Sequence, residues 1–144
     1  MSQTNELEIM ERIALDLENV EESLASSFNT GAEDFNALIR PLSAAGGKRL
    51  RAQLCLLIAN AGTSIERQRV KIAEAVEMLH LATLIHDDVL DQAEIRRGED
   101  TIHMHKGNKV AILSGDYLFA KAFKIVSEMT NMKYLQVFSH IITC

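Results

Sequence analysis

The sequence has little of what disulfide-bonded, thiolate-metal or membrane-spanning proteins need. It contains two cysteines, Cys55 and Cys144, which form no CxxC pair. Neither a disulfide framework nor a thiolate metal site is therefore indicated, and a reducing cytoplasm is the expected location. The longest uninterrupted apolar stretch, residues 54–59, is far below the roughly 18 residues that span a bilayer, so we expect no transmembrane segment.

Basic charge is also scarce. The chain has 15 Lys and Arg against 20 Asp and Glu, a net charge of -5. Few basic residues lie at positions 48–71 and no aromatic residue lies among them, which argues against a nucleic-acid surface. Residues 1–35 hold nine acidic residues and one arginine, which we interpret as a solvated face. The first ten residues lack the basic charge that precedes the apolar run of a targeting peptide.

Helix-breaking residues are rare as well. There is one proline, Pro41, and there are seven glycines, while apolar residues recur at steps of three and four. This pattern predicts an all-α protein, and 144 residues favour a single domain, 1–144. We expect a break at Arg40-Pro41, a turn at residues 61–64, a helix closed by Arg96-Arg97-Gly98 and a polar loop through His103 and His105. The predicted helices cover residues 5–27, 33–39, 48–60, 64 or 65 to 91, 109–128 and 132–144.

A cluster of carboxylates is the strongest functional signal. Asp87, Asp88 and Asp91 lie in a helix that otherwise reads as apolar, where carboxylates are costly without a cation beside them. At about 100° per residue, Asp87 and Asp91 share one face with His80, and Asp88 is offset. Two carboxylates at i and i+4 suit Mg²⁺, which keeps several waters and completes its shell with phosphate oxygens. A phosphorylated substrate is the expected partner.

Two groups of basic residues indicate that two anions bind. Lys48, Arg49 and Arg51 follow a Gly46-Gly47 turn, and Arg96-Arg97 follow the aspartates. Glycines before a basic helix start let backbone N–H groups approach an anion, and the side chains add charge and bidentate contacts. By itself the Gly-Gly-Lys turn is also explained by a plain helix N-terminus.

Four motifs together resemble the trans-polyprenyl diphosphate synthases. They are Gly-Gly-Lys-Arg-Leu-Arg at residues 46–51, His-Leu-Ala-Thr-Leu-Ile-His-Asp-Asp-Val-Leu-Asp at 80–91, Arg-Arg-Gly at 96–98 and Gly-Asp-Tyr-Leu at 115–118. Their order and spacing make the combined signal far more specific than any one motif. The resemblance covers nearly the whole chain and describes the amino-terminal half of the family. It implies part of an all-α isoprenoid-synthase bundle around a central cavity.

The resemblance also implies substrates, a cofactor and roles. Isopentenyl diphosphate would be added to an allylic diphosphate with Mg²⁺ as cofactor, by ionisation of the allylic C–O bond and attack of the second substrate's double bond on the carbocation. Asp87 and Asp91 would be metal ligands, supported by Asp88, and Arg96 would contact the allylic diphosphate. The residues implied to hold isopentenyl diphosphate are Lys48, Arg51, His80 and Arg97. Terpene cyclases lack this second pocket, which argues against cyclisation.

Side chains near the aspartates predict a medium-length or long product. Thr83 and Val76 project in nearly the same direction as Asp87, and Ala82 lies beside the site. All three are small, whereas bulky aromatics at 82 and 83 would close a product pocket early, as in short-chain members of the family.

Other polar residues have structural interpretations. We expect His86 to be a packed, hydrogen-bonded histidine and Asp116 a structural hydrogen-bonding residue. His103 and His105 form a lone HxH without a third ligand nearby, which disfavours a metal site.

The chain lacks one motif that the family carries. Relatives carry a second aspartate-rich motif in their other half, and after Asp116 only Glu128 is acidic here. We therefore expect the 144 residues to be inactive alone and to form a homodimer or pair with a chain that supplies the missing half. One hypothesis is the front half of an elongating prenyltransferase. The alternative is a non-catalytic dimerising or regulatory subunit.

Overall fold

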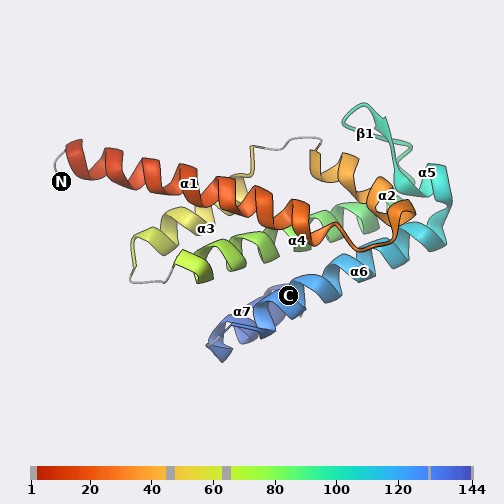
Figure 1. Ribbon diagram of the computed structural model, residues 1–144. Helices are drawn as coiled ribbons and strands as arrows, with labels where there is room; N and C mark the ends of the chain where they lie inside the picture. Colours follow the sequence, from red (N-terminus) through yellow and green to blue (C-terminus); the bar gives the residue numbers. More distant parts are fainter. Residues whose placement is uncertain (1–2, 45–47, 63–65, 130, 144) are drawn as a thin grey trace.

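The computed structural model describes residues 3–44, 48–62, 66–129 and 131–143, and these residues are almost entirely helical (Figure 1). The predicted all-α class is confirmed. The helices are α1 Gln3–Ser27, α2 Glu33–Ala44, α3 Leu50–Asn60, α4 Glu66–Leu90, α5 Ile102–Lys106, α6 Asn108–Ser127 and α7 Met132–Thr143, and a two-stranded hairpin, β1 Ile95–Arg96 and β2 Glu99–Asp100, follows α4. No helix in the described ranges is long and apolar enough to cross a membrane.

Helix α4 is the centre of the structure. It packs most extensively on α6 and also contacts α3 and α1, while α7 packs on α6 (Figure 1). The core between these helices is built from fully or nearly fully buried apolar side chains, among them Val20, Leu24, Leu56, Met78, Ile85 and Leu118. Burying apolar area of this kind is the main stabilising contribution to the fold. Because α4 carries the aspartates, the core fixes the position of the site.

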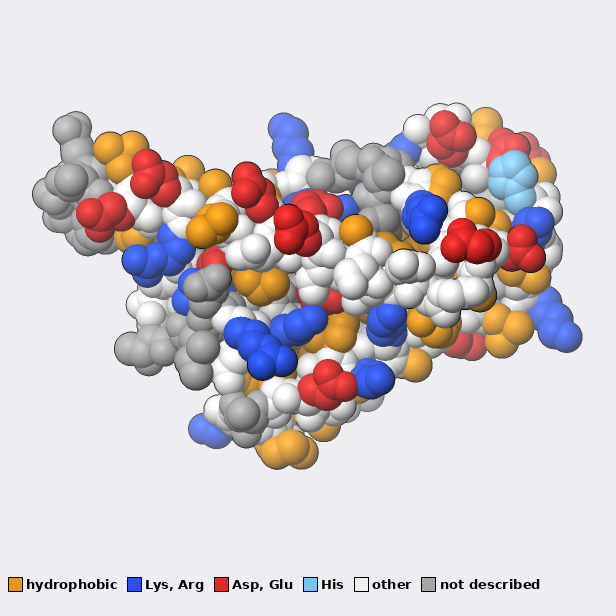
Figure 2. Space-filling view, in the orientation of Figure 1, with side chains coloured by type: hydrophobic (Ala, Val, Ile, Leu, Met, Phe, Trp, Pro, Cys, Tyr) orange, Lys and Arg blue, Asp and Glu red, His pale blue; other side chains and the backbone are white. Residues whose placement is uncertain are grey.

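A buried carboxylate on α4 fixes α1 against it through hydrogen bonds. The Glu74 carboxylate is fully buried and accepts hydrogen bonds from Ser23 Oγ at 2.7 Å and Ser27 Oγ at 2.7 Å. Lys71 Nζ donates to the same carboxylate at 2.8 Å. A buried carboxylate with three donors is satisfied, so it sets the register of the two helices without an unpaired charge. The outer side of α1 is acidic and exposed, as predicted (Figure 2).

Two helix boundaries differ from the prediction. Helix α2 does not break at Arg40-Pro41 but continues through Pro41 to Ala44. Leu38 and Leu42, one turn apart, both pack against the core, and this burial outweighs the hydrogen bond that Pro41 cannot donate. Helix α3 begins at Leu50 rather than at residue 48. The predicted turn at Gly46-Gly47 and the predicted helix start at residue 64 or 65 lie outside the described residues.

The end of α4 also differs from the prediction. The helix ends at Leu90, before the arginines, in a Schellman motif: Ala93 N–H donates to Asp88 O at 2.9 Å, and Gln92 is left-handed with φ 52°. The predicted helix closure by Arg96-Arg97-Gly98 is wrong. Instead, Arg97 and Gly98 form the two-residue turn between β1 and β2. Their φ values of 54° and 87° are both positive, as a hairpin turn of type I′ requires.

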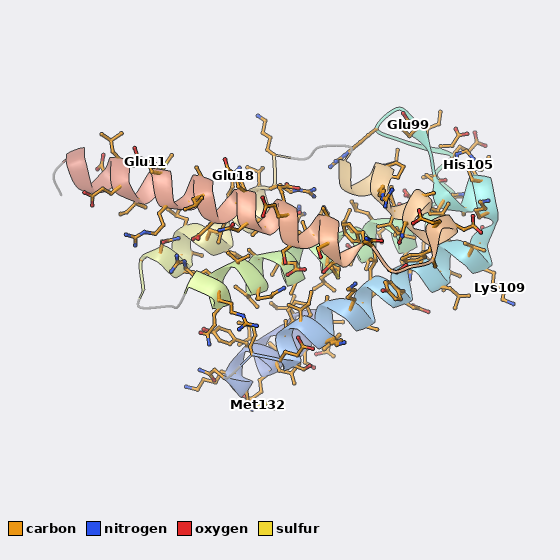
Figure 3. The ribbon with its side chains drawn as sticks, viewed as in Figure 1. Glu11, Glu18, Glu99, His105, Lys109 and Met132 are labelled. Atoms are coloured by element: carbon orange, nitrogen blue, oxygen red, sulfur yellow. The ribbon has the colours of Figure 1, made fainter. Side chains whose placement is uncertain are left out.

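The segment after the hairpin is helical rather than a loop. His103 and His105 lie on the short helix α5, so the predicted polar loop is wrong there. Thr101 precedes α5, and its hydroxyl donates to Ala93 O at 2.8 Å, which ties the start of α5 to the chain that leaves α4. Figure 3 shows His105 on α5 close to Glu99 on the hairpin.

Candidate functional site

The three aspartates at the end of α4 have different surroundings. Asp87 and Asp91 are exposed, and the Asp91 N–H donates to Asp87 O at 2.8 Å, so the two residues are one helical turn apart. Asp88 is 4% exposed, and its Oδ1 accepts a hydrogen bond from Arg96 Nε at 2.7 Å. Within the described ranges, the side chains of Asp87 and Asp91 have no hydrogen-bond or ion-pair partner.

This arrangement fits a hard divalent cation that is shared with a ligand. No group of three or more metal-ligating side chains comes together in the part of the chain that the structure describes. Mg²⁺, however, binds through one or two carboxylates plus waters and substrate phosphates, and two exposed aspartates one turn apart meet that requirement. Asp87 and Asp91 are the residues that could hold such an ion, because Asp88 is paired with Arg96.

The second part of the site is a pocket of about 150 Å³ between the start of α3, α4 and the hairpin turn, which we call the basic pocket. It is lined by Leu42, Lys48, Arg49, Leu50, Arg51, Glu77, His80, Leu81, Leu84 and Arg97. The four residues predicted to bind the second anion, Lys48, Arg51, His80 and Arg97, thus come from three separate motifs and line one pocket.

Burial and nearby positive charge favour the neutral form of His80 by lowering its pKa. Burial lowers the pKa of His80 below its ordinary value of 6.5, and the positive charge of Arg51 lowers it further. The carboxylate of Glu77 acts in the opposite direction but does not reverse the shift. A neutral imidazole beside several cations can still donate one hydrogen bond to an anion.

A second pocket of about 170 Å³ adjoins the first and is mainly apolar. Leu42, Leu81, Leu84 and Arg97 line both pockets, so the two are neighbours on the same side of α4. Arg96 lines the apolar pocket, beside its ion pair with Asp88. Both arginines of the Arg-Arg-Gly motif thus line the apolar pocket, but only Arg97 also borders the basic pocket, whereas Arg96 pairs with Asp88.

The structure places the product-length candidates on two sides of α4. Val76 and Thr83 are half-buried, and Thr83 Oγ1 donates to His80 O at 2.8 Å. Ala82 is fully buried in the core. At about 100° per residue, Ala82 lies roughly 140° around the helix from Asp87, whereas Thr83 is within about 40° of it. Only Val76 and Thr83 thus share the side of Asp87.

The histidines outside the basic pocket have local partners. His86 Nε2 lies 3.1 Å from Ile112 O, and its ring stacks on Phe119 with centroids 5.6 Å apart, which confirms the packed, hydrogen-bonded interpretation. Asp116 Oδ1 is 3.4 Å from His86 Nε2. His103 Nδ1 is 3.0 Å from Thr101 Oγ1, and His105 Nε2 is 3.7 Å from Asp100 Oδ2. These contacts explain the residues without a ligand.

One site residue was missed by the sequence prediction. Glu77 lies on α4 and lines the basic pocket, although it is acidic and 4% exposed. The position of Glu77 in the sequence could have identified it. Glu74 and Glu77 both occur on the apolar side of α4, where unpaired carboxylates are costly. Such residues must have partners, and only the folded chain shows that those of Glu77 are on α3.

Comparisons with known proteins found related sequences and similar structures. A sequence model of the polyprenyl synthetase family matches residues 32–143. The octaprenyl diphosphate synthase of Escherichia coli (strain K12) is 33% identical over 134 residues, which cover 93% of this chain and 42% of that protein. The chloroplastic solanesyl diphosphate synthase 1 of Arabidopsis thaliana is 33% identical over 140 residues, 93% of this chain and 34% of that protein.

Solved structures show the same likeness. The polyprenyl synthase from Caulobacter crescentus CB15, crystallised with calcium and isoprenyl diphosphate, superposes with a TM-score of 0.83 at 36% identity, over 90% of this chain and 41% of that one. The heptaprenyl diphosphate synthase from Staphylococcus aureus gives a TM-score of 0.84 at 28% identity, over 91% and 42%. The chain thus spans between 34% and 42% of the length of the two curated relatives described above.

Proposed function

We propose, because this chain belongs to the polyprenyl synthetase family, that it forms the substrate-binding front half of an all-trans polyprenyl diphosphate synthase. The reaction would add isopentenyl diphosphate to an allylic diphosphate. The observation that carries this proposal is the pairing of two features on one side of α4: an exposed aspartate pair, and a pocket lined by four residues that suit a diphosphate.

The allylic diphosphate would bind at the aspartate end. Asp87 and Asp91 would hold Mg²⁺, which when bound neutralises charge on the leaving diphosphate. Asp88 would orient Arg96 through the 2.7 Å hydrogen bond to Nε, which leaves the two terminal nitrogens of that guanidinium for phosphate oxygens. Neutralising the leaving group lowers the barrier to breaking the allylic C–O bond.

Isopentenyl diphosphate would bind in the basic pocket. Lys48, Arg51 and Arg97 would neutralise its diphosphate, and neutral His80 would donate a hydrogen bond. The double bond of this second substrate then attacks the allylic carbocation, and a proton passes to the departing diphosphate, which restores an alkene. No nucleophilic side chain is needed for these steps.

A pairing partner is part of the proposal. Leu54, Leu57 and Ile58 on α3 are 58%, 49% and 66% exposed, which is costly for a chain that stays alone. We therefore propose a homodimer or a complex with a polypeptide that supplies the second aspartate-rich motif, in the cytoplasm. The same exposed face would suit the alternative function, a non-catalytic dimerising or regulatory subunit.

An elongation assay separates the two functions. The 144-residue chain is incubated with Mg²⁺, farnesyl diphosphate and labelled isopentenyl diphosphate, alone and with a candidate second half. We expect no elongation by the chain alone, elongation by the pair, and loss of elongation in Asp87→Ala and Lys48→Ala. Elongation by the chain alone would contradict the need for a second half. Equal elongation by a pair that contains Asp87→Ala would favour the regulatory subunit.

We further propose that the product is of medium or long chain length. Val76 and Thr83, on the side of α4 that carries Asp87, are small and leave room for a growing chain. In the elongating pair, Thr83→Phe should shorten the product because the ring occupies that space. Thr83→Val, of nearly the same volume, should leave product length unchanged. Product length is read by chromatography, and the same length in Thr83→Phe as in the unmodified pair would refute the proposal.

A further inference from the structure

Helix α3 begins without a cap of its own. The N-cap residue is Arg49, whose backbone is left-handed with φ 46° and ψ 39°, and its side chain makes no capping hydrogen bond. Non-glycine residues rarely adopt positive φ, and N-caps are normally Ser, Thr, Asp or Asn. This strained start lies between Lys48 and Arg51, two residues of the basic pocket. Contacts from elsewhere in the fold must therefore hold it.

A carboxylate on α4 supplies the missing cap. Glu77 Oε1 accepts a hydrogen bond from the Ala52 N–H at 3.0 Å, and Ala52 is the third residue of α3, where an N-cap side chain would bond. Glu77 Oε2 lies 3.6 Å from Arg49 Nη1. The negative charge also faces the positive end of the α3 dipole.

A second carboxylate holds Arg49 from the other side. Glu21 on α1 accepts from Arg49 Nε at 2.6 Å and from Nη2 at 3.1 Å, a bidentate pair. Burial opposes the charge of Arg49, but the hydrogen bond to Glu21 and the charges of Glu21 and Glu77 outweigh it, so the pKa of Arg49 lies above its ordinary value. Three helices thus converge on one residue at the edge of the basic pocket.

The position of Glu77 would otherwise be unfavourable. It lines the pocket that we propose binds a diphosphate, and an unpaired carboxylate there would repel such an anion. Arg49, which Glu77 shares with Glu21, and the start of α3 offset part of this negative charge, and Lys48, Arg51 and Arg97 place positive charge in the lining of the same pocket. The backbone of Lys48 is fixed as well, since Gln53 Nε2 donates to Lys48 O at 2.6 Å.

We propose that Glu77 is a positioning residue of the basic pocket, which caps α3 and holds Arg49 so that Lys48 and Arg51 lie beside His80 and Arg97. The inference rests on the proposed function, because it assumes that the basic pocket binds a diphosphate. Glu77 itself would not contact the ligand's reacting atoms.

Glu74 provides a matched control. It is also a buried glutamate on α4, three residues before Glu77, and is fully buried. Its partners are Ser23, Ser27 and Lys71, none of which lines the basic pocket. A loss of binding caused only by weaker helix packing would therefore appear in Glu74 variants as much as in Glu77 variants.

The test is calorimetric titration of inorganic pyrophosphate into the 144-residue chain, with a chelator to remove divalent metal so that only the basic pocket is tested. Glu77→Ala should weaken binding roughly tenfold, since the cap and the Arg49 pair are both lost. Glu77→Gln keeps an oxygen for the Ala52 N–H and should lose only about threefold. Glu74→Ala and Glu74→Gln should stay within about twofold of the unmodified chain.

Amide hydrogen exchange tests the cap independently of binding. Exchange at the Ala52 N–H should speed up in Glu77→Ala, be largely restored in Glu77→Gln, and stay unchanged in Glu74→Gln. Equal pyrophosphate affinity in Glu77→Ala and the unmodified chain, with binding lost in Lys48→Ala, would overturn the positioning role alone. Tighter binding in Glu77→Gln would overturn it too, because Glu77 would then only repel the anion. No binding by the unmodified chain would overturn this role and the basic pocket together.

Discussion

At the scale of residues, three aspartates within five positions have two different roles. Asp88 points toward the interior and pairs with Arg96, while Asp87 and Asp91 are exposed on another side of α4. The rotation of about 100° per residue along a helix produces this division. The sequence predicted which aspartates share a face, but the ion pair of Asp88 with Arg96 depends on the hairpin, which the sequence did not predict.

The aspartates should therefore differ in their effects on stability. Asp88→Asn removes the charge that pairs with Arg96 in a buried position and should lower the free energy of unfolding by about 1–3 kcal/mol. Asp87→Asn and Asp91→Asn remove exposed charges without partners in the described chain and should change it by no more than about 0.5 kcal/mol. Urea unfolding of the three variants measures this. Equal losses would contradict the division of roles.

The pKa of His80 gives a prediction on pH. Burial and Arg51 lower that pKa in the folded chain below 6.5, so the unfolded chain binds the proton more readily. The free energy of unfolding should therefore fall as the pH is lowered from about 6.5 toward the folded pKa, and His80→Gln should lack this part of the decrease. Titration of the His80 ring by NMR checks the direction. A pKa at or above 6.5 in the free chain would contradict the prediction.

At the scale of elements, the long helices were predictable and the short elements were not. Helices α1, α4, α6 and α7 lie within a few residues of their predicted spans because long amphipathic patterns define them. The sequence gives no strong signal for the end of α4 at Gln92 or for the turn at Arg97-Gly98. Both Gln92 and Arg97 have left-handed backbones, and neither Gln nor Arg typically adopts that conformation. The continuation of α2 through Pro41 depends on core contacts of Leu42, which are tertiary.

The approach of α4 to α6 depends on the lack of a side chain at Gly115. A Cβ built there would lie 2.2 Å from His86 Nε2, and that ring is held by Phe119 and Ile112 O. Gly115→Ala should therefore lower the free energy of unfolding by about 1–3 kcal/mol through overpacking.

Gly62 provides the control for Gly115. Among the described residues, a Cβ at Gly62 meets only Ala59 O at 3.7 Å, so Gly62→Ala should change the free energy of unfolding by no more than about 0.5 kcal/mol. Thermal or urea unfolding distinguishes the two. A Gly115→Ala variant as stable as Gly62→Ala would show that α4 and α6 can separate without cost.

At the scale of the whole molecule, the sequence motifs identified the candidate site residues, and the fold brings these residues together. The sequence predicted Lys48, Arg51, His80 and Arg97 as one binding set, and the structure shows all four lining one pocket. It did not predict Glu77 or the left-handed Arg49, because their roles arise where α1, α3 and α4 meet. Periodicity along one helix contains no information on contacts between helices far apart in sequence.

The central claim is that α4 presents an aspartate pair that binds an allylic diphosphate through a divalent cation. Its most direct test is calorimetric titration of farnesyl diphosphate into the unmodified chain and into the double variant Asp87→Ala/Asp91→Ala, each with and without Mg²⁺. A single variant at an exposed aspartate on α2, Asp34→Ala, is the control. We predict that Mg²⁺ adds binding of farnesyl diphosphate beyond any metal-independent binding in the basic pocket, and that this added binding is lost in the double variant and retained in Asp34→Ala. Equal binding without Mg²⁺, or Mg²⁺-dependent binding retained by the double variant, would contradict the claim.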